Sequence, residues 1–246
     1  MHAEEFYDEY WRSGRHSFGE WDEQSFCRLL SALTGLDCVL DYGCGCGGVY
    51  RRRLSGAVRT YVGADVAEAA LATLRQEGFS ALKINPETGA IDCADSRFDG
   101  AACIEVFEHL FDPLQAAREI NRVLKPGGVL VASVPNFGYF PWRLLALLRA
   151  QVPLEPHSNR YDGVHIRFLS KLMFTRLLRD GGFVDIRIGS WDSASVWDVF
   201  QAMGPFFTIS DYARKHLPKF MHLEFLQDAW PNVFAMRLRA VARKPK

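Results

Sequence analysis

The chain has 246 residues, of which 48% are hydrophobic and 24% charged, as is ordinary for a globular protein. Lysine plus arginine and aspartate plus glutamate both number 29, so the formal net charge is zero. This balance provides no global basic field, so no nucleic-acid partner is expected. The length fits a single domain over residues 1–246.

The N-terminal stretch, the apolar runs and the cysteines bear on the cellular location of the protein. The N-terminal stretch MHAEEFYDEYWRSGRH is acidic and aromatic, unlike a secretory signal peptide. The longest apolar runs, such as YFPWRLLALLRA, contain Arg143 and Arg149 and fall short of the about 20 residues that a transmembrane helix needs. Six cysteines without a CxxC pair indicate reduced thiols. We therefore expect a cytoplasmic protein with no transmembrane segment.

A regular alternation of strands and helices is expected after an aromatic, helical N-terminal segment at 4–34. Apolar runs predict strands at 38–43, 60–66, 80–85, 98–106, 129–135, 184–190 and 233–244. Intervening segments predict helices at 49–56, 67–78, 113–128 and 170–183, the third starting at a proline and stopped by Pro126-Gly127-Gly128. Such alternation is typical of a parallel sheet covered by helices on both faces.

Two aromatic stretches, 137–164 and 191–231, do not fit this alternation. Each follows a predicted strand at the carboxyl side of the sheet, where α/β proteins build substrate pockets. They are interpreted as a helical cap over the sheet edge or as a lid over the substrate. The second interpretation assigns Tyr139, Trp142, Arg160 and Tyr161 to the pocket. Such apolar segments also suit a homodimer interface or a peripheral membrane contact.

A glycine-rich turn lies between the first strand and the following helix. In LDYGCGCGG, Gly43, Gly45 and Gly48 satisfy G-x-G-x-x-G, which lets backbone N–H groups approach a ligand at a helix N-terminus. Asp65 ends the second strand, where a carboxylate accepts both hydroxyls of a ribose. Together these features predict an adenosine ligand.

Asp41 distinguishes between the two main adenosine-containing cofactors, S-adenosylmethionine and NAD. It lies two residues before the first glycine of the turn. A carboxylate there repels the pyrophosphate of a nicotinamide dinucleotide but suits the ammonium group of a methionine moiety. Electrostatics therefore favours S-adenosylmethionine over NAD.

Five motifs follow one another along the chain in a characteristic order. VLDYGCGCGG, VGADV, FDGAACIEVFEHLFDP, REINRVLKPGGVLVASVPN and HIRFLSKLMFTRLLRDGGF resemble the successive motifs of the class I S-adenosylmethionine-dependent methyltransferases. The resemblance covers about residues 36–190 and implies a Rossmann-like, seven-stranded sheet whose last strand is antiparallel. It divides the chain into an N-terminal cap at 1–35, a cofactor-binding core at 36–136 and the two inserted segments.

The resemblance also implies roles for individual residues. Asp65 holds the ribose, Val66 touches the adenine, and Glu105 lies near the sulfonium. Asn85 and Asp92 are the candidates for the acidic contact with the adenine amine. The methionine part is held by Asp41, Gly43, Cys44, Gly45 and Gly47.

The stretch IEVFEHLFDP places Glu105, Glu108 and His109 at positions i, i+3 and i+4, on one face of a helical turn. Three interpretations remain open. The residues are structural; or His109 removes a proton from the acceptor, with Glu105 beside it; or the three residues bind a divalent cation together with His165. The last resembles the small-RNA 2′-O-methyltransferases and the ubiquinone-pathway O-methyltransferases. A metal is not favoured.

We therefore expect a methyltransferase that acts on an oxygen or nitrogen of a small molecule, with S-adenosylmethionine as cofactor. The second hypothesis is a metal-assisted O-methyltransferase of an RNA 3′-end or of a polyphenol or quinone precursor. The third is a non-catalytic subunit that binds S-adenosylmethionine beside a partner. A nicotinamide oxidoreductase comes last, because Asp41 opposes its cofactor.

Overall fold

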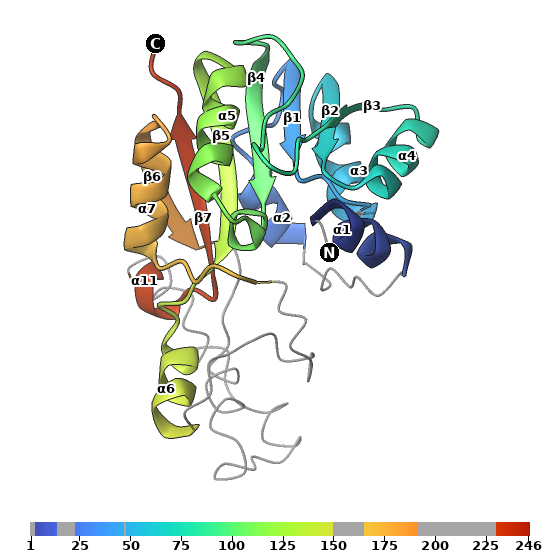
Figure 1. The fold of residues 1–246 in the computed structure, drawn as a ribbon. Helices are drawn as coiled ribbons and strands as arrows, with labels where there is room; N and C mark the ends of the chain where they lie inside the picture. Colours follow the sequence, from blue (N-terminus) through green and yellow to red (C-terminus); the bar gives the residue numbers. More distant parts are fainter. Residues whose placement is uncertain (1–2, 14–22, 47, 150–164, 191–229) are drawn as a thin grey trace.

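The computed structural model describes residues 3–13, 23–46, 48–149, 165–190 and 230–246, which form a central twisted sheet with helices on both faces (Figure 1). Its strands are β1 (Cys38–Tyr42), β2 (Thr60–Asp65), β3 (Ser80–Lys83), β4 (Phe98–Ile104), β5 (Leu124–Pro135), β6 (Val184–Ser190) and β7 (Arg237–Arg243). Their order is β3-β2-β1-β4-β5-β7-β6. The first five strands pair in parallel, and β7 runs antiparallel to β5 and β6. The expected sheet with an antiparallel last strand is confirmed.

The helices in the described residues follow the predicted alternation. They are α1 (Ala3–Arg12), α2 (Glu23–Leu30), α3 (Gly48–Ala57), α4 (Glu68–Gln76), α5 (Pro113–Val123), α6 (Phe140–Arg149), α7 (Lys171–Asp180) and α11 (Pro231–Phe234), with a short 3-10 turn, η1 (Phe107–His109). None of the helices in these residues is long and apolar enough to cross a membrane. Of the two inserted stretches, α6 belongs to the first, while 150–164 and 191–229 lie outside the described residues.

Two apolar cores lie on opposite faces of the sheet, because successive strand residues point to opposite sides. On one face Cys103 of β4 packs in the cluster that contains Ile120 of α5 and Phe174 of α7. On the other, Ala102 of β4 belongs to the cluster of Leu29 and Leu54, from α2 and α3. In Figure 1, α5 and α7 lie in front of the sheet and α2 behind it. Burial on both faces explains why the central strands β1 and β4 are almost continuously apolar.

The junction between α5 and β5 differs from the prediction. The helix starts as expected, because Asp112 accepts a hydrogen bond from the Gln115 N–H and Pro113 follows it. However, β5 begins at Leu124 rather than at 129, and the expected helical stop at Pro126 was wrong. Phe98 pairs with Leu124 but Gly100 pairs with Val129, so the register shifts between the two. Gly127, with φ of +78°, accommodates this irregularity.

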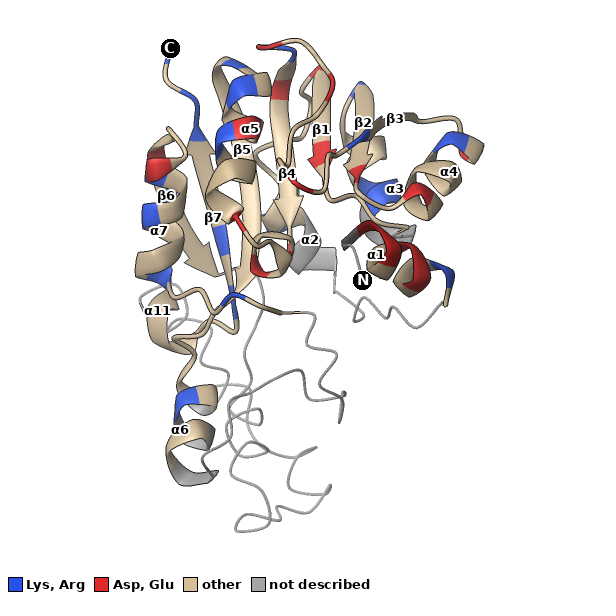
Figure 2. Ribbon diagram, in the orientation of Figure 1, with Lys and Arg blue, Asp and Glu red and all other residues tan. Residues whose placement is uncertain are grey.

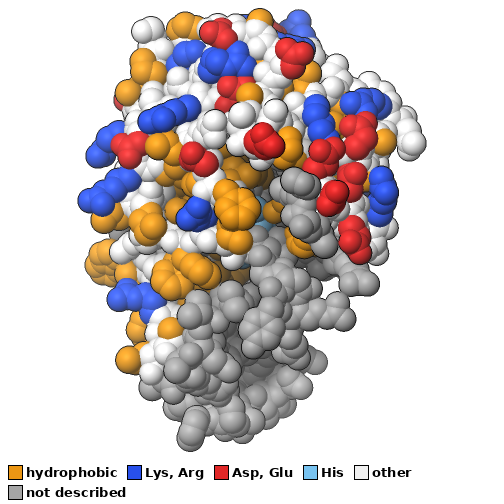
Figure 3. Space-filling view, viewed as in Figure 1, with side chains coloured by type: hydrophobic (Ala, Val, Ile, Leu, Met, Phe, Trp, Pro, Cys, Tyr) orange, Lys and Arg blue, Asp and Glu red, His pale blue; other side chains and the backbone are white. Residues whose placement is uncertain are grey.

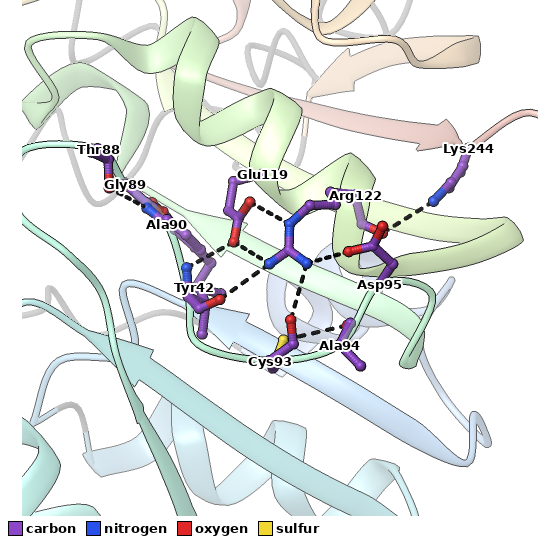
Figure 4. Close-up of polar contacts among 11 residues, drawn as sticks. Tyr42, Thr88, Gly89, Ala90, Cys93, Ala94, Asp95, Glu119, Arg122 and Lys244 are labelled. Atoms are coloured by element: carbon purple, nitrogen blue, oxygen red, sulfur yellow. Dashed lines mark hydrogen bonds and ion pairs between the residues drawn. The ribbon is translucent and has the colours of Figure 1, made fainter.

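A partly buried arginine fork ties α5 to the loop that follows β3 (Figure 4). Arg122 donates from Nε and Nη2 to the carboxylate of Glu119, at 2.8 and 2.7 Å. It also donates to the carbonyls of Cys93 and Ile91 and pairs with Asp95. Glu119 in turn accepts the N–H of Ile91 at 2.7 Å. The fork therefore fixes the loop that runs beside the carboxyl end of β2.

We expect Arg122→Met to lower the free energy of unfolding by about 2–3 kcal/mol, because it leaves the buried Glu119 carboxylate without its charged partner. Burial raises the pKa of Glu119, but the hydrogen bonds from Arg122 and Ile91 outweigh it and lower the pKa below the ordinary value. The pair therefore stabilises the fold above the ordinary glutamate pKa, and this contribution disappears as the pH falls through the lower, folded-state pKa.

Urea denaturation of wild type and variant at several pH values checks this. Arg118→Met, at an exposed position of the same helix, is the matched control and should change stability by no more than about 0.5 kcal/mol. Equal effects of the two substitutions, or a difference from wild type that grows as the pH falls, would contradict the prediction.

Candidate functional site

The candidate site lies at the carboxyl ends of β1, β2 and β4. The strand order reverses between β1 and β4, which are neighbours in the sheet although β2 and β3 lie between them in the chain. At such a switch point the loops after adjacent strands diverge and leave a crevice for a ligand. The glycine loop, Asp65 and Glu105 all follow these strand ends.

The glycine loop is anchored to β2 and closely packed. Gly43 and Cys44 both donate to the carbonyl of Ala64, at 2.8 and 3.0 Å. Gly43 and Gly45 have positive φ, +78° and +52°. A Cβ atom at Gly43 would lie 2.5 Å from Cγ2 of Val106, and one at Gly45 would overlap the indole of Trp11. Both positions therefore require glycine on conformational and steric grounds.

The two described cysteines of the loop, Cys44 and Cys46, are not activated as thiolates. Cys44 is buried, and burial raises its pKa well above the ordinary value. Burial also raises the pKa of Cys46, whose Sγ lies 4.0 Å from the Thr73 hydroxyl. Both thiols are therefore neutral at physiological pH. Gly47 lies outside the described residues.

Asp65 joins the end of β2 to the glycine loop. Its Oδ2 accepts the N–H of Gly45 and its Oδ1 accepts the N–H of Ala67, both at 2.8 Å. The side chain is 5% exposed, and this burial raises its pKa, an effect that the backbone hydrogen bonds partly offset. The carboxylate thus has a fixed orientation at the mouth of the crevice.

Asp41 is buried at the end of β1. It is 1% exposed, and its Oδ2 accepts the hydroxyl proton of Tyr61 at 2.7 Å. The buried carboxylate places negative charge beneath the loop, as the assignment to an ammonium group requires. That assignment stays a prediction.

The candidate adenine contacts have different surroundings. Val66 is half-buried, and its carbonyl accepts a hydrogen bond from Nζ of Lys83 at 2.6 Å. Asn85 is exposed, and its Oδ1 accepts the N–H groups of Glu87 and Thr88, forming a local turn. Asp92 is also exposed. Contact of these residues with an adenine stays a prediction.

Glu105 does not share a helical turn with Glu108 and His109, so that expectation was wrong. It has a φ of +55°, and the 3-10 turn η1 starts only at Phe107. The left-handed backbone at Glu105 changes the direction of the chain. Its carboxylate accepts hydrogen bonds from the Ser133 hydroxyl at 2.7 Å and from Nε of Arg237 at 3.3 Å. Burial raises the pKa of Glu105, and Arg237 opposes this.

Glu108, His109 and His165 form a compact cluster. In both histidines Nε2 lies 3.8 Å from Oε1 of Glu108, and the two imidazole rings are 4.7 Å apart. Ligand atoms of the three side chains all lie within 4.8 Å of one another. The carbonyl of Glu108 accepts the N–H groups of Ile166 and Arg167, which brings His165 to η1. Burial, followed by the positive charge of Arg237, lowers the pKa of His165.

The acceptor side of the site is described only in part. Tyr139 is buried and packs edge-on against Trp142, with ring centroids 5.7 Å apart. Arg160 and Tyr161 lie outside the described residues. In Figure 3, apolar side chains gather on the face where η1 and the segment before α7 lie; Phe111, Ile166 and Phe168 are exposed there.

Two further residues of the site come from α1, whose aromatic residues the sequence already suggests as closing an apolar pocket. Trp11 contacts the glycine loop at Gly45, and the ring of Tyr7 lies 6.4 Å from that of His109. Burial raises the pKa of Tyr7, and the charges of Asp65 and Glu108 add to this. The available signal was the i, i+4 spacing of these two aromatic residues, which places them on one helix face.

Comparison with known proteins gives a consistent result. Residues 40–132 match the family model of a methyltransferase domain. The chain is 30% identical over 157 residues to the ubiquinone biosynthesis O-methyltransferase of Alkalilimnicola ehrlichii, covering 55% of this chain and 62% of that protein. It is 30% identical over 176 residues to a Mycolicibacterium smegmatis protein described as a probable S-adenosylmethionine-dependent methyltransferase, covering 71% of this chain and 62% of that one. The chain thus spans less than two thirds of either relative.

A solved structure shows the same fold. The S-adenosylmethionine-dependent methyltransferase of Archaeoglobus fulgidus superposes with a TM-score of 0.56 at 18% identity, covering 97% of this chain and 98% of that one. At this identity the likeness concerns the fold alone.

We expect Gly45→Ala to destabilise the protein by about 1–2 kcal/mol through left-handed strain, and by about 1 kcal/mol more because Trp11 must move. Gly35→Ala is the matched control, since Gly35 also has a positive φ but open space around its Cα. Urea denaturation measures both. The additional cost should disappear in a Trp11→Leu background; if it persists there, Trp11 is not its cause.

Proposed function

We propose that the chain, as a member of the class I S-adenosylmethionine-dependent methyltransferase superfamily, transfers the methyl group of S-adenosylmethionine to an oxygen or nitrogen of a small molecule. The observation that carries the proposal is the buried carboxylate of Asp65, which the backbone of Gly45 and Ala67 holds at the switch point of the sheet.

The residues at the crevice fit this cofactor. The cofactor carries a ribose with two hydroxyl donors and a cationic methionine end, so it needs carboxylates at two places. Asp65 and Asp41 end the neighbouring strands β2 and β1, with Asp41 opposite Gly63 of β2. Asp65 would hold the ribose and Asp41 would favour the ammonium, while the glycine loop between them allows close approach of the backbone.

Bound S-adenosylmethionine would supply an electrophilic methyl group on a sulfonium. The protein's own task is then to orient the acceptor, exclude water and remove a proton. Glu105, directly after β4, has a carboxylate held in place by Ser133 and Arg237, and it would face the sulfonium side of the cofactor. No covalent intermediate with the enzyme is required.

His109 is the residue proposed to take the proton from the acceptor. Its side chain is 17% exposed, so it is shielded but reachable, and Glu108 beside it would stabilise the imidazolium that forms. An oxygen acceptor is supported by the relative from Alkalilimnicola ehrlichii, which is described as an O-methyltransferase. The zero net charge supports a small acceptor rather than a nucleic acid.

We expect wild-type protein to bind S-adenosylhomocysteine and Asp65→Asn to bind it about tenfold or more weakly, because the variant loses charge-assisted hydrogen bonds to the ribose. Isothermal titration calorimetry measures both affinities. Asp37→Asn is the control, since Asp37 is an exposed carboxylate paired with Arg59 just before β1. Absence of binding to wild type would refute the proposed cofactor, and unchanged binding to Asp65→Asn would refute the role of Asp65.

Metal-assisted O-methylation is a second candidate function, favoured by the cluster of Glu108, His109 and His165. One carboxylate and two imidazoles suit a divalent ion such as Mn²⁺, which would lower the pKa of an acceptor hydroxyl. Glu105, the fourth ligand suggested by the sequence, is not part of the cluster, since its carboxylate pairs with Arg237 and Ser133. The protein would therefore supply three ligands from its described residues.

If this second candidate holds, chelator-treated protein should bind one equivalent of Mn²⁺, and Glu108→Gln or His165→Ala should abolish the binding. Glu105→Gln is the matched control, expected to retain the metal. Electron paramagnetic resonance of free Mn²⁺ quantifies the bound fraction. No stoichiometric uptake by wild type would exclude the metal, and loss of uptake in Glu105→Gln would give the site a different ligand set.

A further inference from the structure

The helix α1 lies below the carboxyl ends of β1 and β2, at the lower right of the described fold in Figure 1. Two of its aromatic side chains, one turn apart, reach into the site. Trp11 fills the space directly beside the Cα of Gly45. Tyr7 lies beside His109, and the electrostatic influence of both Asp65 and Glu108 reaches its hydroxyl. The helix therefore bridges the cofactor half and the acceptor half of the crevice.

Polar contacts hold α1 in this position against β3 and α4. Oδ1 of Asp8 accepts the N–H of Ala69, at 2.9 Å, in the first turn of α4. The residue at the N-cap of α4, Ala67, has no side-chain acceptor of its own, so Asp8 caps the helix from a distant part of the chain. At the other end of α1, Glu4 pairs with Lys83 at 2.6 Å.

The strength of these contacts is suited to reversible docking. Glu4 and Lys83 are both about two fifths exposed, at 42% and 37%, so their ion pair is weak and screened by salt. A helix of ten residues is marginal on its own and depends on its docking contacts. Figure 2 shows that much of α1 consists of acidic residues, coloured red. Of these, Glu5 and Glu9 are exposed, and their negative charges repel one another when the helix forms.

We propose that α1 is a gate over the cofactor crevice, which admits and releases the cofactor when the helix undocks from Ala69 and Lys83. The inference rests on the cofactor binding of the proposed function. A closed α1 covers the glycine loop and the mouth at Asp65, so the cofactor cannot pass while Trp11 lies against Gly45. Undocking is then a step shared by entry and exit, and it governs both rates.

The gate has a kinetic signature. Weakening the Asp8 contact raises the association and dissociation rate constants of S-adenosylhomocysteine together, so the dissociation constant changes less than either rate. We expect Asp8→Ala to raise both rate constants about tenfold, as the loss of one charge-assisted hydrogen bond implies. Asp8→Asn, which keeps the Oδ1 acceptor, should restore rates close to those of wild type. Glu4→Gln should raise both rates less, and only at low salt.

Stopped-flow measurement of intrinsic tryptophan fluorescence with S-adenosylhomocysteine gives the rate constants of the full-length chain. Glu9→Ala, an exposed acidic position on the same helix, is the matched control and should leave them unchanged. Thermal unfolding of each variant establishes that the fold persists; if Asp8→Ala does not fold, Glu4→Gln at low salt provides the same test.

The other outcomes overturn the gate. A faster dissociation alone would make α1 an ordinary wall of the site, and a faster association alone would make it a competitor of the cofactor. Unchanged rates in both Asp8→Ala and Glu4→Gln would leave α1 with no part in exchange. Failure of the proposed function is distinguishable, because wild-type protein would then show no calorimetric binding of S-adenosylhomocysteine at all.

Discussion

The hydrogen bonds of the Asp65 carboxylate are the interaction on which the rest of the site depends. One oxygen fixes the glycine loop through Gly45 and the other fixes the start of α4 through Ala67. Because the side chain is 5% exposed, an unsatisfied charge there would be costly, so the two backbone contacts are obligatory. They set the distance between the loop after β1 and the end of β2, and hence the width of the crevice. The same loop position gives Trp11 of α1 its contact with Gly45.

Three other acids, Glu119, Asp41 and Glu105, are stabilised in different ways. Both oxygens of Glu119 accept hydrogen bonds from Arg122, which lowers the pKa of Glu119. This carboxylate therefore serves the stability of the fold. Asp41 accepts a neutral tyrosine hydroxyl, so its charge is not cancelled by that partner. Glu105 has an arginine, but at 3.3 Å and partly exposed, and its pKa is raised by burial. Asp41 and Glu105 are therefore the two carboxylates that the proposed function sets against the cationic end of the cofactor.

Much of the fold was predictable, because the central strands are mostly apolar and alternate with amphipathic helices. The crevice at Asp41, Gly43 and Asp65 followed from the same pattern, since a parallel sheet brings adjacent strand ends together. The positive φ of Glu105 was not predictable, because no residue type there requires it and the i, i+3, i+4 spacing imitates a helix. The boundary at Leu124 was missed for a similar reason: a register shift, rather than the Pro-Gly-Gly sequence, decides where β5 begins.

The pairing of His109 with His165 depends on backbone contacts and holds for either chemistry. Because the carbonyl of Glu108 accepts two N–H groups from the segment after His165, the two imidazoles are neighbours by virtue of the chain's path. The lowered pKa keeps His165 neutral near pH 7, and the neutral form is the one that accepts a proton or coordinates a cation. The position of Glu105 therefore matters more than the histidines in separating the two candidate functions. While Arg237 holds its carboxylate, Glu105 is not available as a fourth ligand to the cluster.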